Sequence, residues 1–159
     1  MMQTIIFMIT PIFWFLDLSM VESSIDDCII LPLNKIHNRA GNITIVEEKK
    51  NIPFDIRRIY YLYDIPGGEA RGGHAHKELC QLIVAASGSF NVILDDGIKK
   101  KEVSLSRPNY GLLIIPGIWR ELMEFSSGAI CLVLASNKFD ENDYLREYSD
   151  FINYKHARG

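Results

Sequence analysis

Short apolar runs separated by turn-forming residues are the feature that most limits how this chain can fold. Seven such runs lie between residues 42 and 136, and the segments between them contain PGG, SGS, DDG, RPN and SSG. These residue types supply the positive φ angles and local side-chain hydrogen bonds that tight turns need. The runs are NITIVEE (42–48), RRIYYLYD (57–64), LCQLIVAAS (79–87), SFNVILDD (89–96), KKEVSLS (100–106), YGLLIIP (110–116) and AICLVLAS (129–136). Because no helical periodicity lies between them, the pattern predicts an antiparallel β-barrel or β-sandwich.

The last segment, FDENDYLREYSDFINYKHARG (139–159), has a different period. Its apolar residues recur at the spacing of one helix face. They are Tyr144, Tyr148, Phe151 and Ile152. Asp140 is a suitable N-cap, and Glu141 and Asp143 would favour the positive end of a helix dipole. The pattern therefore predicts a helix that begins after Asp140 and packs on the outside of the barrel.

Length, charge and cysteine content narrow the class of protein. The 159 residues allow one domain with a substantial core and are few for two. The formal net charge is −3, so no basic surplus exists to neutralise a nucleic acid. Cys28, Cys80 and Cys131 form no CxxC pair, which argues against a disulfide framework or a zinc knuckle. We therefore expect a cytoplasmic protein, with Cys80 and Cys131 packed as small apolar residues.

The amino-terminal stretch over residues 1–19 is apolar but does not fit a membrane segment. Its apolar run, from Ile5 to Leu16, is shorter than the roughly 20 residues that a membrane-spanning helix needs, and Pro11 interrupts it. A secretory signal would carry a basic start, whereas the first Lys or Arg of the chain is Lys35. We therefore expect no membrane association, an apolar extension over residues 1–19 and a single domain over residues 20–159.

The stretch GGEARGGHAHKELCQ (67–81) concentrates side chains that can do chemistry. His74 and His76 are two residues apart, so on a strand both imidazoles point to the same face. If that face is the barrel interior, they line one cavity beside Arg71. Nearby positive charge lowers the pKa of a histidine, which keeps the ring neutral and able to accept a proton. The pattern is compatible with an acid/base site, a metal site or a hydrogen-bonded structural pair.

The spacing of glycines and histidines over residues 68–88 resembles the first motif of the cupin superfamily of small β-barrels. In metal-binding cupins the position of Gln81 is usually Glu, and a further His follows a Pro-Gly turn in the second motif. Here the second motif reads GLLIIPGIWRELMEF (111–125), with Arg120 where that His is expected. A neutral amide and a guanidinium remove two of the four ligands. We therefore expect an acid/base site with no metal and no other cofactor.

Two longer stretches resemble one family within this superfamily. They are RRIYYLYDIPGGEARGGHAHKELCQLIVAASGSFNVILDDG (57–97) and PGIWRELMEFSSGAICLVLASNKFDENDYLREY (116–148). They are similar to the sugar 3,4-ketoisomerases that act on dTDP-4-oxo-6-deoxyglucose. The resemblance implies an all-β cupin, or jelly-roll β-barrel, with a C-terminal helix. It also implies a homodimer without a cofactor that moves the keto group of a dTDP-4-oxo-6-deoxyhexose from C4 to C3. The product would serve the synthesis of 3-amino-3,6-dideoxy sugars for surface polysaccharides such as lipopolysaccharide O-antigen or S-layer glycans.

By position, the resemblance places His74 and His76 at the family's active-site pair. Tyr60 lies on the preceding strand, where alternation directs it to the same cavity. A register shift of one residue would bring Tyr61 there instead. We expect His74 to take the C3 proton, while His76 or Tyr60 moves protons between the two oxygens of an enediol.

Cationic and aromatic residues around this pair are candidates for binding the nucleotide. Arg58, Arg71 and Arg120 carry guanidinium groups that suit the oxygens of a diphosphate. Trp119 can stack on thymine or pack in the core. Many relatives carry Trp-His-Glu where this chain has Trp119, Arg120 and Glu121, a difference that bears on nucleotide contact and product stereochemistry.

Two other functions stay open at this point. One is a metal-dependent cupin enzyme, which Gln81 and Arg120 disfavour. The other is a non-catalytic cupin that binds a nucleotide sugar without exchanging its protons.

Overall fold

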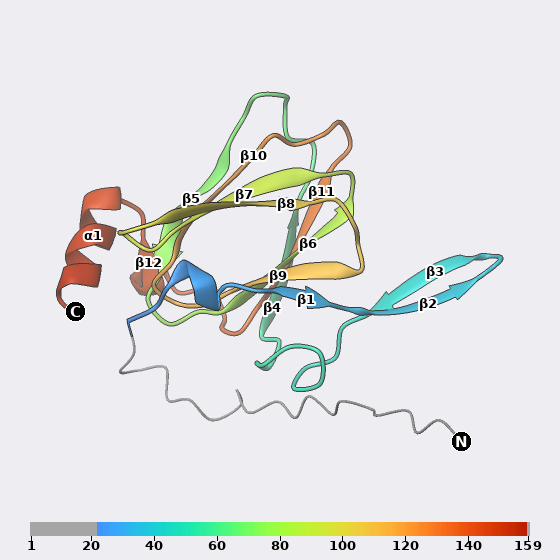
Figure 1. Cartoon of the computed structure of the whole chain (residues 1–159), viewed down its shortest axis with the longest axis horizontal. Helices are drawn as coiled ribbons and strands as arrows, with labels where there is room; N and C mark the ends of the chain where they lie inside the picture. Colours follow the sequence, from blue (N-terminus) through green and yellow to red (C-terminus); the bar gives the residue numbers. More distant parts are fainter. Residues whose placement is uncertain (1–21, 159) are drawn as a thin grey trace, which may run out of the picture.

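Two five-stranded antiparallel sheets lie face to face, and a two-stranded hairpin projects from one end of them (Figure 1). This is a computed structural model that describes residues 22–158, so the expected extension over residues 1–19 lies outside the described residues. The order of the first sheet is β1-β9-β6-β11-β4, and that of the second is β12-β5-β10-β7-β8. Most neighbouring strands in the two sheets are distant in sequence, as in a jelly roll, and β7 and β8 form the one pair that is consecutive along the chain.

The elements have the following bounds. The first sheet contains β1 (Ile30–Pro32), β9 (Tyr110–Ile114), β6 (Gln81–Ser87), β11 (Ile130–Ala135) and β4 (Arg58–Leu62). The second contains β12 (Tyr144–Leu145), β5 (Arg71–His76), β10 (Trp119–Met123), β7 (Phe90–Asp95) and β8 (Lys100–Leu105). The hairpin is β2 (Asn34–Asn38) with β3 (Gly41–Ile45). The helical elements are the 3-10 turns η2 (Ile25–Asp27) and η3 (Glu141–Asp143) and the helix α1 (Tyr148–His156).

The predicted fold class is confirmed: the chain is mostly strand, with one helix near its C-terminal end. Each of the seven apolar runs overlaps a strand, although that of the first run, β3, lies in the hairpin and not in the two sheets. The sheets are not joined by backbone pairing into one closed barrel, so the architecture is an open jelly roll. Strand β10 has no β-branched residue and was not among the predicted runs. It forms because it pairs on both sides, with β5 and with β7.

The predicted start of the C-terminal helix is wrong. Asp140 caps the short turn η3, where its carboxylate accepts from the backbone N–H of Asn142 at 2.9 Å. Tyr144 then enters β12 and pairs with His76, so it is not part of a helix face. The helix α1 begins only at Tyr148, because backbone pairing with β5 holds the preceding residues extended. None of the helices described between residues 22 and 158 has the length and apolar character needed to cross a membrane.

The core has three parts that follow from the two-sheet arrangement. The largest fills the space between the sheets and includes Phe90 and Val133. A second covers the outer face of the first sheet, where Ile52 and Phe54 pack on Leu82. The third fastens α1 to the second sheet through the fully buried Phe151. Burying a side chain of this size contributes about 1.5–3 kcal/mol relative to leaving it exposed.

The three cysteines are free thiols. Cys131 is buried as predicted, Cys28 is also buried, and Cys80 is half-buried. Burial raises the pKa of Cys28 and Cys80 to about 11 and that of Cys131 to about 12. The thiols therefore stay protonated at neutral pH and act as packing groups.

The hairpin carries apolar side chains on an arm without a core of its own. Ile36 and Ile43 face each other across its two strands, and they are 51% and 58% exposed. The arm extends away from both sheets (Figure 1). A two-stranded hairpin is only marginally stable when isolated in water, so this arm needs a surface against which to pack.

Candidate active site

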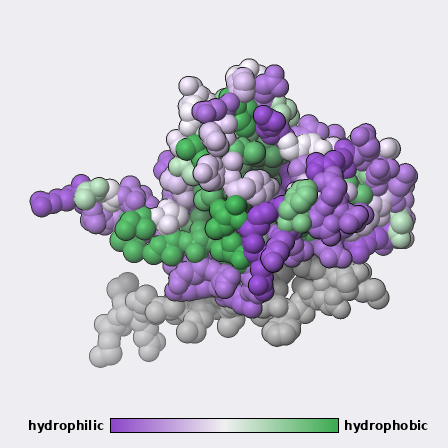
Figure 2. Space-filling model, turned by 180° about the vertical axis from the view of Figure 1, so that it is seen from behind, coloured by the Kyte–Doolittle hydropathy of each residue, from purple (hydrophilic) through white to green (hydrophobic). Residues whose placement is uncertain are grey.

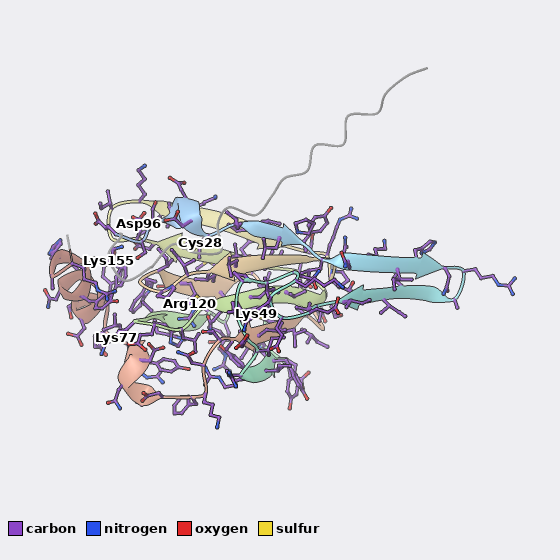
Figure 3. The ribbon with its side chains drawn as sticks, turned by 90° about the horizontal axis from the view of Figure 1, so that it is seen from below. Cys28, Lys49, Lys77, Asp96, Arg120 and Lys155 are labelled. Carbon is purple, nitrogen blue, oxygen red and sulfur yellow. The ribbon has the colours of Figure 1, made fainter. Side chains whose placement is uncertain are left out.

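A cavity of about 150 Å³ opens between the inner faces of the two sheets. Its polar lining combines Tyr60, Arg71, His74, Gln81 and Arg120. Its apolar lining includes Leu62, Ile83, Leu122 and Val133. Figure 3 shows Arg120 within the molecule, between the ribbons of the sheets. The cavity thus brings together one histidine, one tyrosine and two arginines that the sequence singles out.

A bulge in β5 sets the direction of the HxH pair. Arg120 of β10 pairs with His74, but Leu122 pairs with Arg71, so β5 has one extra residue between these pairs. Gly72 lies in this bulge with a φ of 88°, and a Cβ there would approach Leu122 Cδ1 to 2.8 Å. Glycine is therefore required at this position, and the bulge turns the following residues into the interior.

His76 is held by a carboxylate from the turn before β12. Its Nδ1 lies 2.7 Å from Oδ2 of Asp143, whose Oδ1 accepts from the backbone N–H of Glu78 at 2.7 Å. Because the carboxylate can only accept, it selects the tautomer in which Nδ1 carries the proton. The Nε2 atom of His76 is buried and has no hydrogen-bond partner among the described residues. Nε2 therefore presents a lone pair.

His74 has a similar arrangement on the cavity side. Its ring lies edge-on to that of His76, with centroids 5.0 Å apart, and both rings contact Tyr144. A hydrogen bond to the backbone of Gly72 holds the ring. Its Nε2 is likewise buried without a partner in the described part of the chain. His76 does not line the cavity itself and lies directly behind His74.

Burial, followed by the positive charge of Arg120, lowers the pKa of His74 and of His76 to about 2. Both rings are therefore neutral at pH 7. A neutral imidazole with a free lone pair on the wall of a cavity can accept a proton from a bound molecule. The cavity has the chemistry of an acid/base site.

Arg120 forms the inner wall of the cavity and is only 2% exposed. Its guanidinium donates to the carbonyl of His74 at 2.9 Å and to Oε1 of Gln81 at 2.7 Å. Burial lowers its pKa to about 10, so the group stays positively charged at neutral pH. A fixed cation bonded to Gln81 does not fit the donor set of a divalent metal, which needs two ligands at these positions. Among the described residues, no three His, Cys, Asp or Glu side chains form a metal-binding group.

Tyr60 faces the cavity, as strand alternation predicts. Its hydroxyl accepts from Nε2 of Gln81 at 2.9 Å, and burial raises its pKa. Tyr61 points to the opposite face and is 61% exposed, so the register shift that would exchange these two residues does not occur.

Arg58 lies beside the cavity without lining it. Its Nη2 donates to the hydroxyl of Tyr144 at 3.4 Å, and its guanidinium lies over the rings of Tyr60 and Phe139. Arg71 lines the cavity and is exposed, which suits a ligand that reaches the surface. The three predicted arginines therefore differ in exposure: Arg120 is buried, Arg58 is half-buried and Arg71 is exposed.

Of the two alternatives for Trp119, the structure favours packing in the core over stacking on thymine, because Trp119 lies outside the cavity. Its indole is buried on the other face of the second sheet, against Tyr148 and Phe151 of α1. Its Nε1 donates to Glu121 at 3.0 Å. Strand alternation explains the placement, since the adjacent Arg120 points inward. Trp119 is a core residue that anchors the helix.

Two residues that contact the histidines, Asp143 and Tyr144, are not among the site residues predicted from the sequence. Asp143 was predicted to favour a helix dipole, and Tyr144 was predicted to lie on the helix face. Both lie in the FDENDY segment (139–144), whose resemblance to the family was the available signal. Their role could not be deduced, because the contact spans 67 residues of sequence.

The fold and the cavity define a jelly-roll protein with a cation-lined acid/base site. Comparison with known proteins identifies the family: residues 26–156 match the family model FdtA, described as WxcM-like, C-terminal. The chain is 46% identical over 125 residues to the TDP-4-oxo-6-deoxy-alpha-D-glucose-3,4-oxoisomerase of Aneurinibacillus thermoaerophilus, covering 79% of this chain and 90% of that one. The chain belongs to this family of sugar 3,4-ketoisomerases.

Solved structures agree with this assignment. A 3,4-ketoisomerase from Helicobacter canadensis has 43% identity and a TM-score of 0.80, covering 82% of this chain and 98% of that chain. A mutant 3,4-ketoisomerase from Thermoanaerobacterium thermosaccharolyticum, in complex with TDP-4-keto-6-deoxyglucose, has 36% identity and a TM-score of 0.81. That match covers 82% of this chain and 95% of that chain.

Proposed function

We propose that this protein is a dTDP-sugar 3,4-ketoisomerase that moves the keto group of a dTDP-4-oxo-6-deoxyhexose from C4 to C3. The observation that carries the proposal is the neutral His74 in a cavity that it shares with Tyr60 and Arg120. The names of the relatives, and the bound TDP-4-keto-6-deoxyglucose of one of them, support the same substrate.

The reaction needs only proton transfers. Nε2 of His74 takes the proton from C3, which the neighbouring carbonyl makes acidic, and the C4 oxygen gains a proton to give an enediol. The C3 hydroxyl then loses its proton, and C4 receives one, so that a ketone forms at C3 and an alcohol at C4. Tyr60, which lines the cavity, moves the protons between the two oxygens; His76, the other candidate, lies behind His74. Atoms and electrons balance without a further reactant.

Charge that develops on the enediol oxygens is stabilised within the cavity. Arg120 supplies a fixed cation, and Tyr60 supplies a hydroxyl. Loss of one such preorganised donor typically costs about 100- to 1000-fold in rate. Because Arg120 is bound to the protein on two sides, we assign the diphosphate to the exposed Arg71, and Arg58, next to the cavity, is the second candidate.

The product determines which reaction can follow. A ketone at C3 is the group that an amino-transfer reaction requires, which supports the proposal that the product supplies 3-amino-3,6-dideoxy sugars for surface polysaccharide. The free, protonated thiols support a location in the reducing cytoplasm.

We further propose that the protein is a homodimer, with the hairpin of each copy packed on its partner. The outer side of β4 and the residue after it expose Ile59, Tyr61 and Tyr63. Figure 2 shows apolar side chains gathered on the body beside the base of the hairpin. Exposed apolar patches of this kind mark interaction surfaces, and a second copy would supply the packing that the hairpin lacks.

Incubation with dTDP-4-oxo-6-deoxyglucose followed by NMR of the product tests the activity. We expect a 3-oxo sugar, whose C4 configuration the same spectrum reveals. Substrate deuterated at C3 should lose its label to water. Binding with full retention of deuterium would show a non-catalytic cupin instead. Inactivation by a chelator with recovery on adding a metal would show a metal-dependent enzyme.

A further inference from the structure

The buried amide of Gln81 contacts two groups that each determine its orientation. Gln81 extends from β6 of the first sheet, and Arg120 from β10 of the second, so their hydrogen bond crosses between the sheets. Tyr60 extends from β4 on the other side of Gln81. The three side chains form a continuous series along the wall of the cavity.

We propose that Gln81 is a positioning residue that makes Tyr60 donate its hydroxyl proton to the sugar. The inference rests on the proposed ketoisomerase function and assigns a direction to one hydrogen bond of that site.

The direction of the hydrogen bond between Gln81 and Tyr60 follows from which groups can donate and which can accept. A guanidinium has donors only, so the amide oxygen of Gln81 must face Nη2 of Arg120, as it does at 2.7 Å. The amide nitrogen must then face Tyr60. An amide NH₂ group cannot accept, so the contact of 2.9 Å requires the tyrosine oxygen to accept.

The tyrosine proton is consequently left for another acceptor. Among residues 22–158, Gln81 and Arg120 are the side chains that hydrogen-bond the Tyr60 hydroxyl, and both of them donate to it. Tyr60 also lines the cavity beside His74, so a sugar oxygen bound there is within its reach. The cation of Arg120 polarises the Gln81 amide, which strengthens its donation to Tyr60 and makes the tyrosine a better donor.

Two near-isosteric substitutions separate orientation from packing. In Gln81→Glu the carboxylate accepts from Arg120 and also from Tyr60, which turns the tyrosine proton away from the sugar. In Gln81→Met neither hydrogen bond exists, but nothing competes for the proton. We expect kcat to fall about 100-fold in Gln81→Glu, with KM changed only a few-fold, and to fall much less in Gln81→Met.

A double variant provides the control. If Gln81 acts through Tyr60, then Gln81→Glu combined with Tyr60→Phe should be no slower than Tyr60→Phe alone. Multiplied losses in the double variant, or a loss in Gln81→Met as large as in Gln81→Glu, would overturn the inference. Thermal unfolding of each variant identifies any loss that arises from misfolding.

A measurement made without substrate tests the direction of the Tyr60 hydrogen bond independently of enzymatic activity. The chain has seven tyrosines, and NMR of protein labelled at tyrosine Cζ follows the titration of each. The signal of Tyr60 is the one missing from Tyr60→Phe. We expect Gln81→Glu to raise the pKa of Tyr60 above its wild-type value, because a carboxylate replaces a donor. An unchanged pKa overturns the inference. A raised pKa in a protein whose wild type never exchanges C3 deuterium supports the hydrogen-bond direction and overturns the proposed reaction.

Discussion

The carboxylate of Asp143 lies 2.7 Å from Nδ1 of His76, although 67 positions separate the two residues in sequence. The turn η3 and the short strand β12 produce this contact, since β12 pairs with β5 next to His76. The pair fixes which nitrogen of His76 carries a proton, and so directs the other nitrogen toward the interior.

Replacing Asp143 with Asn should impair turnover more than binding. The amide can donate as well as accept, so it no longer selects one tautomer of His76. We expect kcat to fall at least about tenfold, with TDP affinity little changed, in steady-state kinetics and calorimetry. Asp150→Asn, at an exposed carboxylate of α1, is the matched control. Equal activity of the two variants would exclude a role for the Asp143 contact.

Replacing His74 with Asn should abolish isomerisation, because Asn cannot take up the C3 proton. Affinity for TDP should stay within a few-fold of wild type, since the diphosphate is assigned to Arg71. Deuterium exchange at C3 and calorimetry measure the two properties separately. His156→Asn, at the exposed end of α1, should retain activity. Parallel loss of affinity and turnover in His74→Asn would instead give His74 a binding role.

Stability should fall as the pH is lowered from about 6.5 toward 2. Burial lowers the pKa of His74 and His76 to about 2, whereas an unfolded histidine titrates near 6.5. Between these values the unfolded chain binds protons that the folded chain does not, so acid favours unfolding by up to about 1.4 kcal/mol per pH unit for each histidine. Urea unfolding at pH 7 and pH 5 should therefore show a smaller loss of stability in His74→Asn than in wild type. The same loss in both would mean that His74 is protonated in the folded state.

Trp119 should matter for stability and not for nucleotide binding. Trp119→Ala removes a buried indole beside Phe151 and should destabilise the fold by about 3–5 kcal/mol. Trp119→Phe keeps most of the packing and should leave TDP affinity unchanged. Calorimetry on Trp119→Phe distinguishes the two roles. A large loss of TDP affinity in this variant would support stacking of Trp119 on thymine.

The hairpin should control the oligomeric state. Light scattering on purified protein should give twice the mass of the chain, and Ile36→Asp with Ile43→Asp should give a monomer. Ile98→Asp, at an exposed isoleucine in the turn between β7 and β8, is the control and should stay dimeric. A wild-type protein that is monomeric at every concentration would exclude the dimer.

Local patterns predict much of this fold but not its long-range contacts. Alternation correctly gives the inward direction of Tyr60, because side-chain direction on a strand depends only on the parity of the position. The strand β12 and the late start of α1 depend on pairing with β5, and a local sequence pattern contains no information on such long-range pairing.

The same distinction applies to the site. The HxH spacing predicts two histidines on one face, and the structure places their rings next to each other in a T-shaped arrangement. Asp143 was missed because an Asp after a capping residue has the same local pattern in a helix as in a 3-10 turn.

Under the proposed function, the hydrogen bond between Arg120 and Gln81 also limits which sugars fit the cavity. Because it ties the sheets together across the cavity, neither residue can be exchanged to make room without leaving a buried polar group unpaired. Room for a bulkier hexose must therefore come from smaller residues in the apolar lining that the first sheet contributes, at Leu62, Ile83 or Val133.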